Sequence, residues 1–438
     1  MAGSHSDSPT SSGRAGTAAV TVTTVGVLPV YMVSVLWVQL REDLEFGPSL
    51  LGSLVACFFL TSAVTSLTAG MLVGRFGTSP ILRVSAVMSA ATMLAIALGA
   101  QHTEILVAAL CLAGWSNGVG SPASNDLISQ AVSPHRQGLS FGTKQAAIPL
   151  STMIAGVAVP LIAIPFGWRP AFAGGAVLAL LVLLVVPGSG RLKSRASSAP
   201  SDAAGPFNRT ALVVLAVGIM LGAASGGALG SFFVATAVDS GISPSGAGVL
   251  AVVASALGAG ARIGFGWLAD KLRRKWLNVV ATQMVIGGLA YLLLATGVEV
   301  LVAAGAVIGY CTGWAWSGLS TFAVSRMHPG MAARATAITQ GGMGAGAALG
   351  PLVFGVLVAV TSYAVAWYVT AAMSLVAGAI VLQGRRMLIR DRPALVAAQE
   401  QRRRRTASGR SKAPARSQVS GHGEGSPAVH EEGRRRYP

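Results

Sequence analysis

Three ionisable side chains lie inside long apolar stretches of the chain: Asp126, Lys144 and Arg262. A charge in the middle of a membrane helix costs about 2.5 to 3.5 kcal/mol, so a charged residue kept there is a functional candidate. Two cations without a fixed counter-ion would repel each other and lose solvation, which favours an anionic ligand as their partner. Arginine would hold a carboxylate with a planar fork of donors, whereas lysine would act as a point charge.

The depth of each charge along its helix suggests what it could do. Arg262 lies roughly 9 Å inside the end of its helix, and Lys144, followed by Gln145, lies about six residues into another. We expect Arg262, Lys144 and Gln145 to contact a substrate; the alternatives are a gate contact or snorkelling toward water for Arg262, and snorkelling for Lys144. Asp126 lies near a helix end, where it would form an ion pair with Lys144 or Arg75, or exchange a co-transported proton.

The residues that enzymes and metal sites commonly use are scattered in this sequence. The three cysteines, Cys57, Cys111 and Cys311, fall in apolar stretches without metal-ligand spacing, and we interpret them as packing residues. We therefore expect no catalytic residues, no metal site, no cofactor and no enzymatic activity. The six histidines all fall in expected loops or tails: His5, His102, His135, His328, His422 and His430.

The apolar stretches are long enough to cross a membrane. Hydrophobic residues make up 53% of the chain and charged residues 11%. A helix that crosses a hydrocarbon core of about 30 Å needs roughly 20 apolar residues. The sequence predicts an all-α membrane protein with twelve transmembrane helices, at 18–40, 49–73, 80–100, 104–130, 138–163, 168–187, 210–237, 244–268, 276–297, 300–325, 332–360 and 363–386.

The segments between and beyond these helices differ in composition. Residues 188–209 form a linker with Pro, Ser, Gly and basic residues, which separates a six-helix bundle at 18–187 from another at 210–386. Residues 1–17 are rich in Ser, Gly and Thr, and residues 387–438 are rich in Arg, Ser, Ala and Gly. We expect both to be disordered tails because they lack the apolar content to fold.

The basic residues occupy alternate loops of the predicted topology. In membrane proteins this pattern encodes orientation, so we interpret the net charge of +17 as a membrane signal rather than a nucleic-acid footprint. With the basic loops inside, both termini are cytoplasmic, in a bacterial-type inner (plasma) membrane. The expected partners are the lipid bilayer and a small-molecule substrate, and we expect a monomer.

The two predicted bundles align with each other at a nearly constant offset. Pro48 corresponds to Pro244 and Gly52 to Gly248, both 196 residues apart. The intervals 134–145 and 329–340 match at an offset of 195. Several matches at nearly one offset indicate an internal duplication, which is typical of transporters whose halves rock about a site near the membrane midplane.

Segment 266–275, GWLADKLRRK, resembles the loop motif G-x-L-A-D-R-x-G-R-K of the major facilitator superfamily. The first-half counterpart at 70–77, GMLVGRFG, keeps both glycines but has Gly74 in place of the acid. The resemblance implies the major facilitator fold, two pseudo-symmetric six-helix bundles. It also implies a gate role for Asp270, against the start of the fifth helix or Arg326, because a carboxylate there can accept charge-assisted hydrogen bonds.

The preceding turns, 261–270, resemble helix eight of oxalate:formate antiporters and monocarboxylate transporters, where an arginine binds the carboxylate. The arginine that drug/proton antiporters carry in helix four is replaced here by Gly114. The expected function is therefore secondary transport of a small organic anion, a carboxylate, by alternating access. The alternatives are a transporter or efflux pump for a neutral or hydrophobic solute and, more distantly, a nontransporting membrane sensor.

Overall fold

The protein is described by a computed structural model that covers residues 9–44, 46–100, 102–131, 137–187, 208–271, 275–328 and 332–390. Within these ranges the regular elements are all helical. Long apolar runs form helices in a membrane because a helix satisfies every backbone donor and acceptor internally.

The first half of the described chain contains α1 (Pro9–Val35), α2 (Trp37–Leu44), α3 (Pro48–Phe76), α4 (Thr78–Gly99), α5 (Thr103–Ala131), α6 (Gln137–Gln145), α7 (Ala147–Ala158), the π-helical turn η2 (Val159–Ala163), α8 (Ile164–Phe166), α9 (Trp168–Leu181) and the 3-10 turn η3 (Val182–Leu184). The second half contains α10 (Arg209–Asp239), α11 (Pro244–Lys271), α12 (Trp276–Leu294), α13 (Glu299–Ile308), the π-helical turn η4 (Gly309–Gly313), α14 (Trp316–Met327), α15 (Ala332–Val360) and α16 (Tyr363–Arg390).

Eleven helical stretches of the described residues are long and apolar enough to span a membrane, and the shorter apolar helix Trp168–Leu184 occupies the place of the sixth predicted span. The all-α membrane fold is confirmed, and several spans, such as the fifth and tenth, consist of more than one helix because a π-helical turn or a break interrupts them.

The start of the first helix differs from the expectation of a disordered tail over 1–17. α1 begins at Pro9, and residues 1–8 lie outside the described residues. The small residues support the extra turns: the Thr17 hydroxyl donates to the Gly13 carbonyl at 3.1 Å, and Ala15 is buried. At the other boundary of the first half, most of the predicted linker lies outside the described residues, and Asn208 caps α10 by accepting the Ala211 N–H at 2.8 Å. The predicted tail after 387 also starts as helix, because α16 continues to Arg390; the remainder lies outside the described residues.

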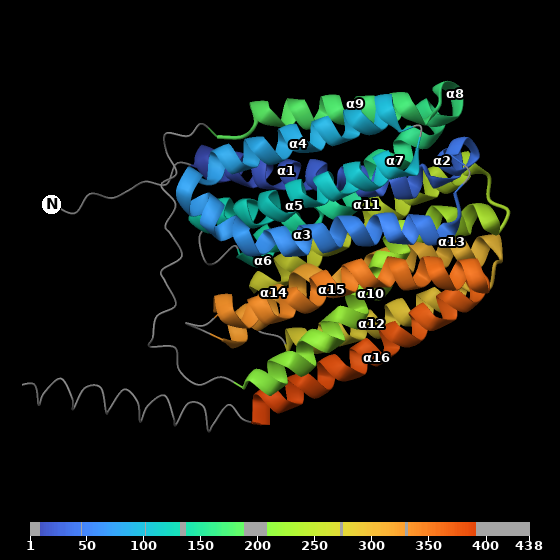
Figure 1. Cartoon of the computed structure of the whole chain (residues 1–438). Coiled ribbons are helices and arrows are strands. Elements are labelled where there is room, and N and C mark those ends of the chain that lie inside the picture. The colour runs from blue at the N-terminus through green and yellow to red at the C-terminus, as the bar shows by residue number, and fades with distance from the viewer. Residues whose placement is uncertain are drawn as a thin grey trace, which may run out of the picture. The chain divides into compact units, whose positions relative to one another are not determined.

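The helices of each half pack mainly with one another. In the first half α5 packs on α1, α3 and α4, and in the second half α10 and α12 pack on α16. Figure 1 shows the blue to green helices of the first half beside the light green to red helices of the second, with α3 and α15 adjacent at the boundary. The halves are not separate domains in space, since residues up to Asp391 form one compact unit.

The contact between α3 and α15 is tight at one end of the helices. A methyl group added to Gly355 would lie 2.6 Å from the Pro48 carbonyl oxygen, and one added to Gly52 would collide with the Pro351 carbonyl oxygen. An added methyl at Gly70, further along α3, would meet no atom within 4 Å. Small residues therefore bring the two halves into backbone contact at the Gly52 end.

The contact of α6 and α7 with α11 is close along its whole length. A methyl group added to Gly156 would lie 2.8 Å from the Gly248 carbonyl oxygen, and one added to Gly142 would lie 2.6 Å from the Arg262 carbonyl oxygen. The pairs run antiparallel, since the residue number rises on one helix as it falls on the other. This second seam joins the halves from one end of the membrane span to the other.

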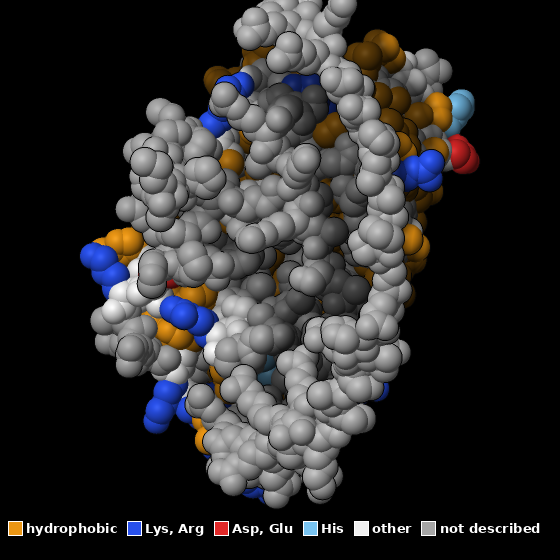
Figure 2. All heavy atoms as spheres, turned by 90° about the vertical axis from the view of Figure 1, so that its left-hand side faces the viewer, with side chains coloured by type: hydrophobic (Ala, Val, Ile, Leu, Met, Phe, Trp, Pro, Cys, Tyr) orange, Lys and Arg blue, Asp and Glu red, His pale blue; other side chains and the backbone are white. Residues whose placement is uncertain are grey.

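The two ends of the helices carry opposite charge. We call the end where α3, α5, α11 and α14 finish the basic end, and the opposite end the acidic end. Figure 2 views the basic end, where the described charged side chains are mainly Lys and Arg. The basic side chains near this end are Arg14, Arg75, Arg83, Arg209, Lys271, Lys275, Arg326, Arg334, Arg385, Arg386 and Arg390, and the acidic ones are Asp126 and Asp270. The acidic end has Glu42, Asp43, Glu104, Asp239 and Glu299 with Arg41 and Arg169.

Candidate functional site

Arg262 lies on α11 with its side chain buried between the helices, 2% exposed. Its Nη2 donates to the Trp314 carbonyl oxygen at 2.6 Å, and its guanidinium carbon lies 5.0 Å from the centre of the Trp314 ring. The Nε and Nη1 atoms have no hydrogen-bond partner among the described residues. A buried cation thus keeps donors free, which is costly unless another group meets them.

Trp314 meets Arg262 at a break in the tenth span. The π-helical turn η4 ends at Gly313, and α14 begins only at Trp316, so Trp314 and Ala315 lie between the two helical segments. The Trp314 N–H donates to the Gly309 carbonyl at 3.0 Å, five residues back. Such π-type interruptions often occur at functional sites, and this one places a backbone carbonyl in reach of the arginine.

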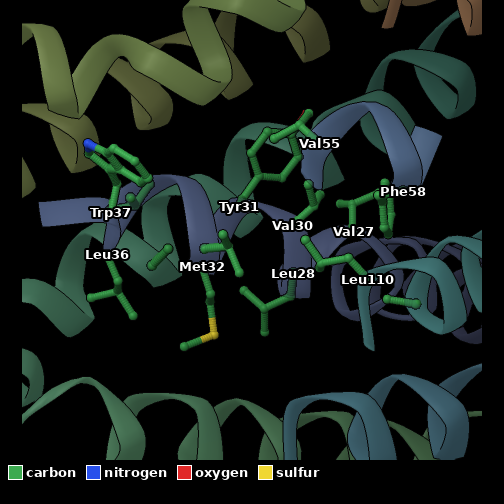
Figure 3. Packing of buried hydrophobic residues seen from close by; sticks show 14 of the residues in the cluster. Val27, Leu28, Val30, Tyr31, Met32, Leu36, Trp37, Val55, Phe58 and Leu110 are labelled. Atoms are coloured by element: carbon green, nitrogen blue, oxygen red, sulfur yellow. The ribbon is translucent and has the colours of Figure 1, made fainter. Parts of the chain in front are cut away.

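Aromatic rings surround the Arg262 guanidinium and its Trp314 partner. The Trp314 ring makes edge contacts with Tyr31 at 5.7 Å and Tyr310 at 5.3 Å between ring centres. Tyr31 comes from α1 in the other half, and Figure 3 shows it on the opposite side of α1 from Leu28 and Met32. The cluster of Arg262, Trp314, Tyr310 and Tyr31, which we call the arginine cluster, therefore spans the boundary between the halves.

Glycines of α10 make room for the Trp314 ring. A methyl group added to Gly230 would lie 2.5 Å from that ring, and one added to Gly226 would collide with it. This arrangement could not be predicted from the sequence, although the aromatic residues inside apolar stretches and the glycines of α10 are the signals that point to it.

Lys144 is buried near the end of α6, and its hydrogen-bond partners lie on α5 of the same half. Its Nζ donates to the Ser121 carbonyl at 2.9 Å, the Ser121 hydroxyl at 3.1 Å and the Asn125 side-chain oxygen at 2.6 Å. All three acceptors are neutral and lie on α5, so they saturate the ammonium group. Lys144 and Arg262 are on helices that touch at Gly142, yet Lys144 donates to α5 whereas Arg262 donates to the Trp314 carbonyl. Gln145, half-buried, ends α6.

Asp270 reaches across the second seam to the start of the fifth span. Its Oδ2 accepts the backbone N–H of Leu139 at 2.8 Å, in the first turn of α6. The positive end of the helix dipole and a charge-assisted hydrogen bond both favour a carboxylate there. Arg326, the other expected contact, is exposed and lies over the Phe322 ring at 5.5 Å.

The two remaining residues of the expected gate lie near the basic end of the first half. Asp126 on α5 accepts the Thr78 hydroxyl at 2.5 Å, which ties the start of α4 to α5. Arg75 is exposed and lies over the Phe76 ring at 5.4 Å. The hydrogen bonds of Lys144 go to Ser121 and Asn125 rather than to Asp126.

Comparison with known proteins supports the fold. The nucleoside transporter NupG, crystallised as a mutant, superposes with a TM-score of 0.68 at 14% identity, covering 84% of this chain and 99% of that one. A bacterial homolog of the human lysosomal transporter Spinster, in an inward-facing and occupied conformation, superposes with a TM-score of 0.67 at 16% identity, covering 86% and 97%.

One curated sequence relative is a voltage-gated purine nucleotide uniporter of Mus musculus, 26% identical over 147 residues. That match covers 32% of this chain and 33% of the relative, so only about a third of the relative's length is matched. The family model described as Major Facilitator Superfamily matches residues 19–215 and 214–423. The chain therefore belongs to the major facilitator superfamily and is a transporter of that fold.

Proposed function

We propose that the protein moves a small organic anion, a carboxylate, across the membrane by alternating access, with Arg262 as the anion contact. The observation that carries the proposal is the buried guanidinium, whose Nε and Nη1 atoms have no partner among the described residues. A buried charge without a paired acid is costly, and a bound carboxylate would supply both the opposite charge and the acceptors.

The remaining donors suit a carboxylate. Arginine carries five N–H donors, and Nη2 has two of them, of which the Trp314 carbonyl takes one. One edge of the guanidinium therefore keeps two parallel donors for bidentate binding. Lys144, whose ammonium is saturated by α5, would contribute long-range attraction to the anion in this conformation rather than a direct contact.

The relatives favour this proposal in one respect. The purine nucleotides named for the mouse uniporter are anions, because nucleotides carry phosphate groups. NupG and the Spinster homolog share only 14% and 16% sequence identity with this chain, so they support the fold and say nothing about the substrate. A neutral or hydrophobic solute is the alternative, and the experiment below separates it from an anion.

Asp270 would act as the gate at the basic end during the transport cycle. In the present conformation it joins α11 of one half to α6 of the other, so the halves can separate at this end only if the contact with Leu139 breaks. We further propose that the basic end faces the cytoplasm, since the described Lys and Arg side chains gather there.

The experiment is ligand binding to purified wild type, Arg262→Lys and Arg262→Ala, measured as stabilisation against heating by mono- and dicarboxylates, amino acids and cationic drugs. A charge-assisted hydrogen bond contributes about 1.5 to 3 kcal/mol, so Arg262→Ala should lose roughly ten- to a hundredfold in carboxylate affinity. Arg262→Lys keeps the charge but loses the fork, and it should also bind substantially more weakly. Arg83→Lys and Arg83→Ala, at an exposed position, are the matched controls.

Two results would overturn the proposal. If carboxylates stabilise Arg262→Ala as well as wild type, the arginine is structural. If only neutral or cationic ligands stabilise wild type, the substrate is not an organic anion.

A further inference from the structure

Three buried hydroxyl groups close to Arg262 have no hydrogen-bond partner among the described residues. They belong to Tyr291, Tyr310 and Ser255, and each of these side chains has an exposed fraction of 0%. Nearly all buried polar atoms in proteins are hydrogen-bonded, so three unpaired hydroxyls in one region call for a ligand or ordered water.

The hydroxyls come from three elements that meet at the arginine cluster. Tyr310 is in η4 and its ring lies 5.3 Å from that of Trp314. The Tyr291 hydroxyl, from α12, lies against Gly313, the residue before Trp314. Ser255 is on α11, two turns before Arg262, and its hydroxyl lies beside that of Tyr310, as does the hydroxyl of Thr152. Arg262 is in turn within electrostatic reach of both tyrosines.

The chemistry of these groups differs from that of the arginine. A guanidinium only donates hydrogen bonds, whereas each hydroxyl both donates and accepts. A ligand that carries only a carboxylate can accept hydrogen bonds but cannot donate any. It would therefore bind the guanidinium and leave the hydroxyl oxygens of the protein without a donor. A molecule that also carries hydroxyl groups of its own would pair with both.

The charge around the cluster indicates a single negative charge on that molecule. Arg262 supplies one positive charge, and the other buried cation of this region, Lys144, has all three of its donors engaged by α5. A second carboxylate would find no free cation among the described residues next to the three hydroxyls.

We propose that the substrate is a hydroxylated monocarboxylate, with its carboxylate on Arg262 and its hydroxyl groups on Tyr291, Tyr310 and Ser255. This inference rests on the proposed function, since it assigns the carboxylate to the same arginine. A site with buried polar groups discriminates strongly against an analogue that lacks the matching hydroxyls, because that analogue leaves those groups unpaired.

The test compares acids that differ only in their hydroxyl groups. Binding to the purified full-length protein is measured by calorimetry for gluconate against hexanoate and for glycerate against propionate, two pairs of different length. We expect the hydroxylated acid of at least one pair to bind more than tenfold more tightly than its partner. Tyr310→Phe and Tyr291→Phe should each reduce that ratio by roughly tenfold and leave the affinity for the unsubstituted acid within about threefold.

Tyr310→Phe and Tyr291→Phe each remove a single buried oxygen and keep the ring, so the fold should tolerate both substitutions. Tyr363→Phe, at the start of α16, is the matched control and should leave the ratio unchanged. If the acids bind in an Arg262-dependent way with ratios near one, or if the tyrosine variants leave the ratio intact, this inference fails and the proposed function stands. If none of the four acids binds, both fail.

Discussion

The seam between α3 and α15 allows a test of whether the acidic end of the transporter is closed in this conformation. A methyl group at Gly52 would collide with the Pro351 carbonyl oxygen, which is backbone and has little freedom to move. Gly52→Ala should therefore destabilise the conformation in which the acidic end is closed and favour conformations in which it is open. Gly70→Ala makes the same change on the same helix where no atom lies within 4 Å of the added methyl.

The size of the effect follows from the clash. Overpacking a close contact costs about 1 to 3 kcal/mol, which would shift the ratio of open to closed acidic ends by about 5-fold to 150-fold. Alanine also favours helix over glycine by about 1 kcal/mol, but this gain applies to both conformations and cancels. The control variant shares that gain and lacks the clash.

The assay is the rate at which a cysteine in the seam reacts with a membrane-impermeant maleimide. Ser49→Cys, half-buried at the acidic end of α3, serves as the reporter in nanodisc-embedded protein whose three native cysteines are replaced by alanine. We expect Gly52→Ala to raise the labelling rate several-fold above that of Gly70→Ala. Equal rates in the two variants would refute the assignment of the closed end.

Two further predictions concern the polar contacts. Asp270→Asn should lose about 0.3 to 2 kcal/mol of interaction with the start of α6. The protein should stay folded, but its transport should weaken and a cysteine at Met327 should be labelled faster; unchanged labelling and transport would remove the gate role. Lys144→Met leaves Ser121 and Asn125 without their shared donor and should destabilise the fold by about 1.5 to 3 kcal/mol, measured as a lower thermal midpoint. The control Lys275→Met, at an exposed position, should leave the midpoint unchanged, and equal midpoints in the two variants would contradict the tie between α5 and α6.

The number and order of the spans could be predicted from the sequence, because each apolar run is as long as the membrane requires. The duplication and the loop motif also predicted the contact of Asp270 with the start of the fifth span, because that start lies opposite the motif in the fold. These predictions rest on patterns that repeat over many residues, and small shifts in register do not change them.

The partners of single side chains could not be predicted in the same way. Lys144 and Arg262 are both expected to contact a substrate, but the side chain of Lys144 turns to α5, where it donates to three neutral acceptors. The partner of Arg262 is a carbonyl that becomes available where a π-helical turn interrupts the tenth span. The position of the helix break, and so the carbonyl that is left without a helical partner, depends on packing, here of Gly226 and Gly230 against Trp314. The local sequence pattern does not predict this packing.

The charge of Arg262, which has no acidic partner among the described residues, has an electrical consequence. A full unit charge that crosses a membrane potential of 100 mV changes energy by about 2.3 kcal/mol, and Arg262 lies inside a span, nine residues from the end of α11. With a monoanion bound, the arginine and its ligand together carry no net charge, so the loaded halves rearrange with little sensitivity to voltage. In the proposed alternating-access cycle the empty protein would shift the positive charge of Arg262 relative to the field, so we expect the membrane potential to act on the return step.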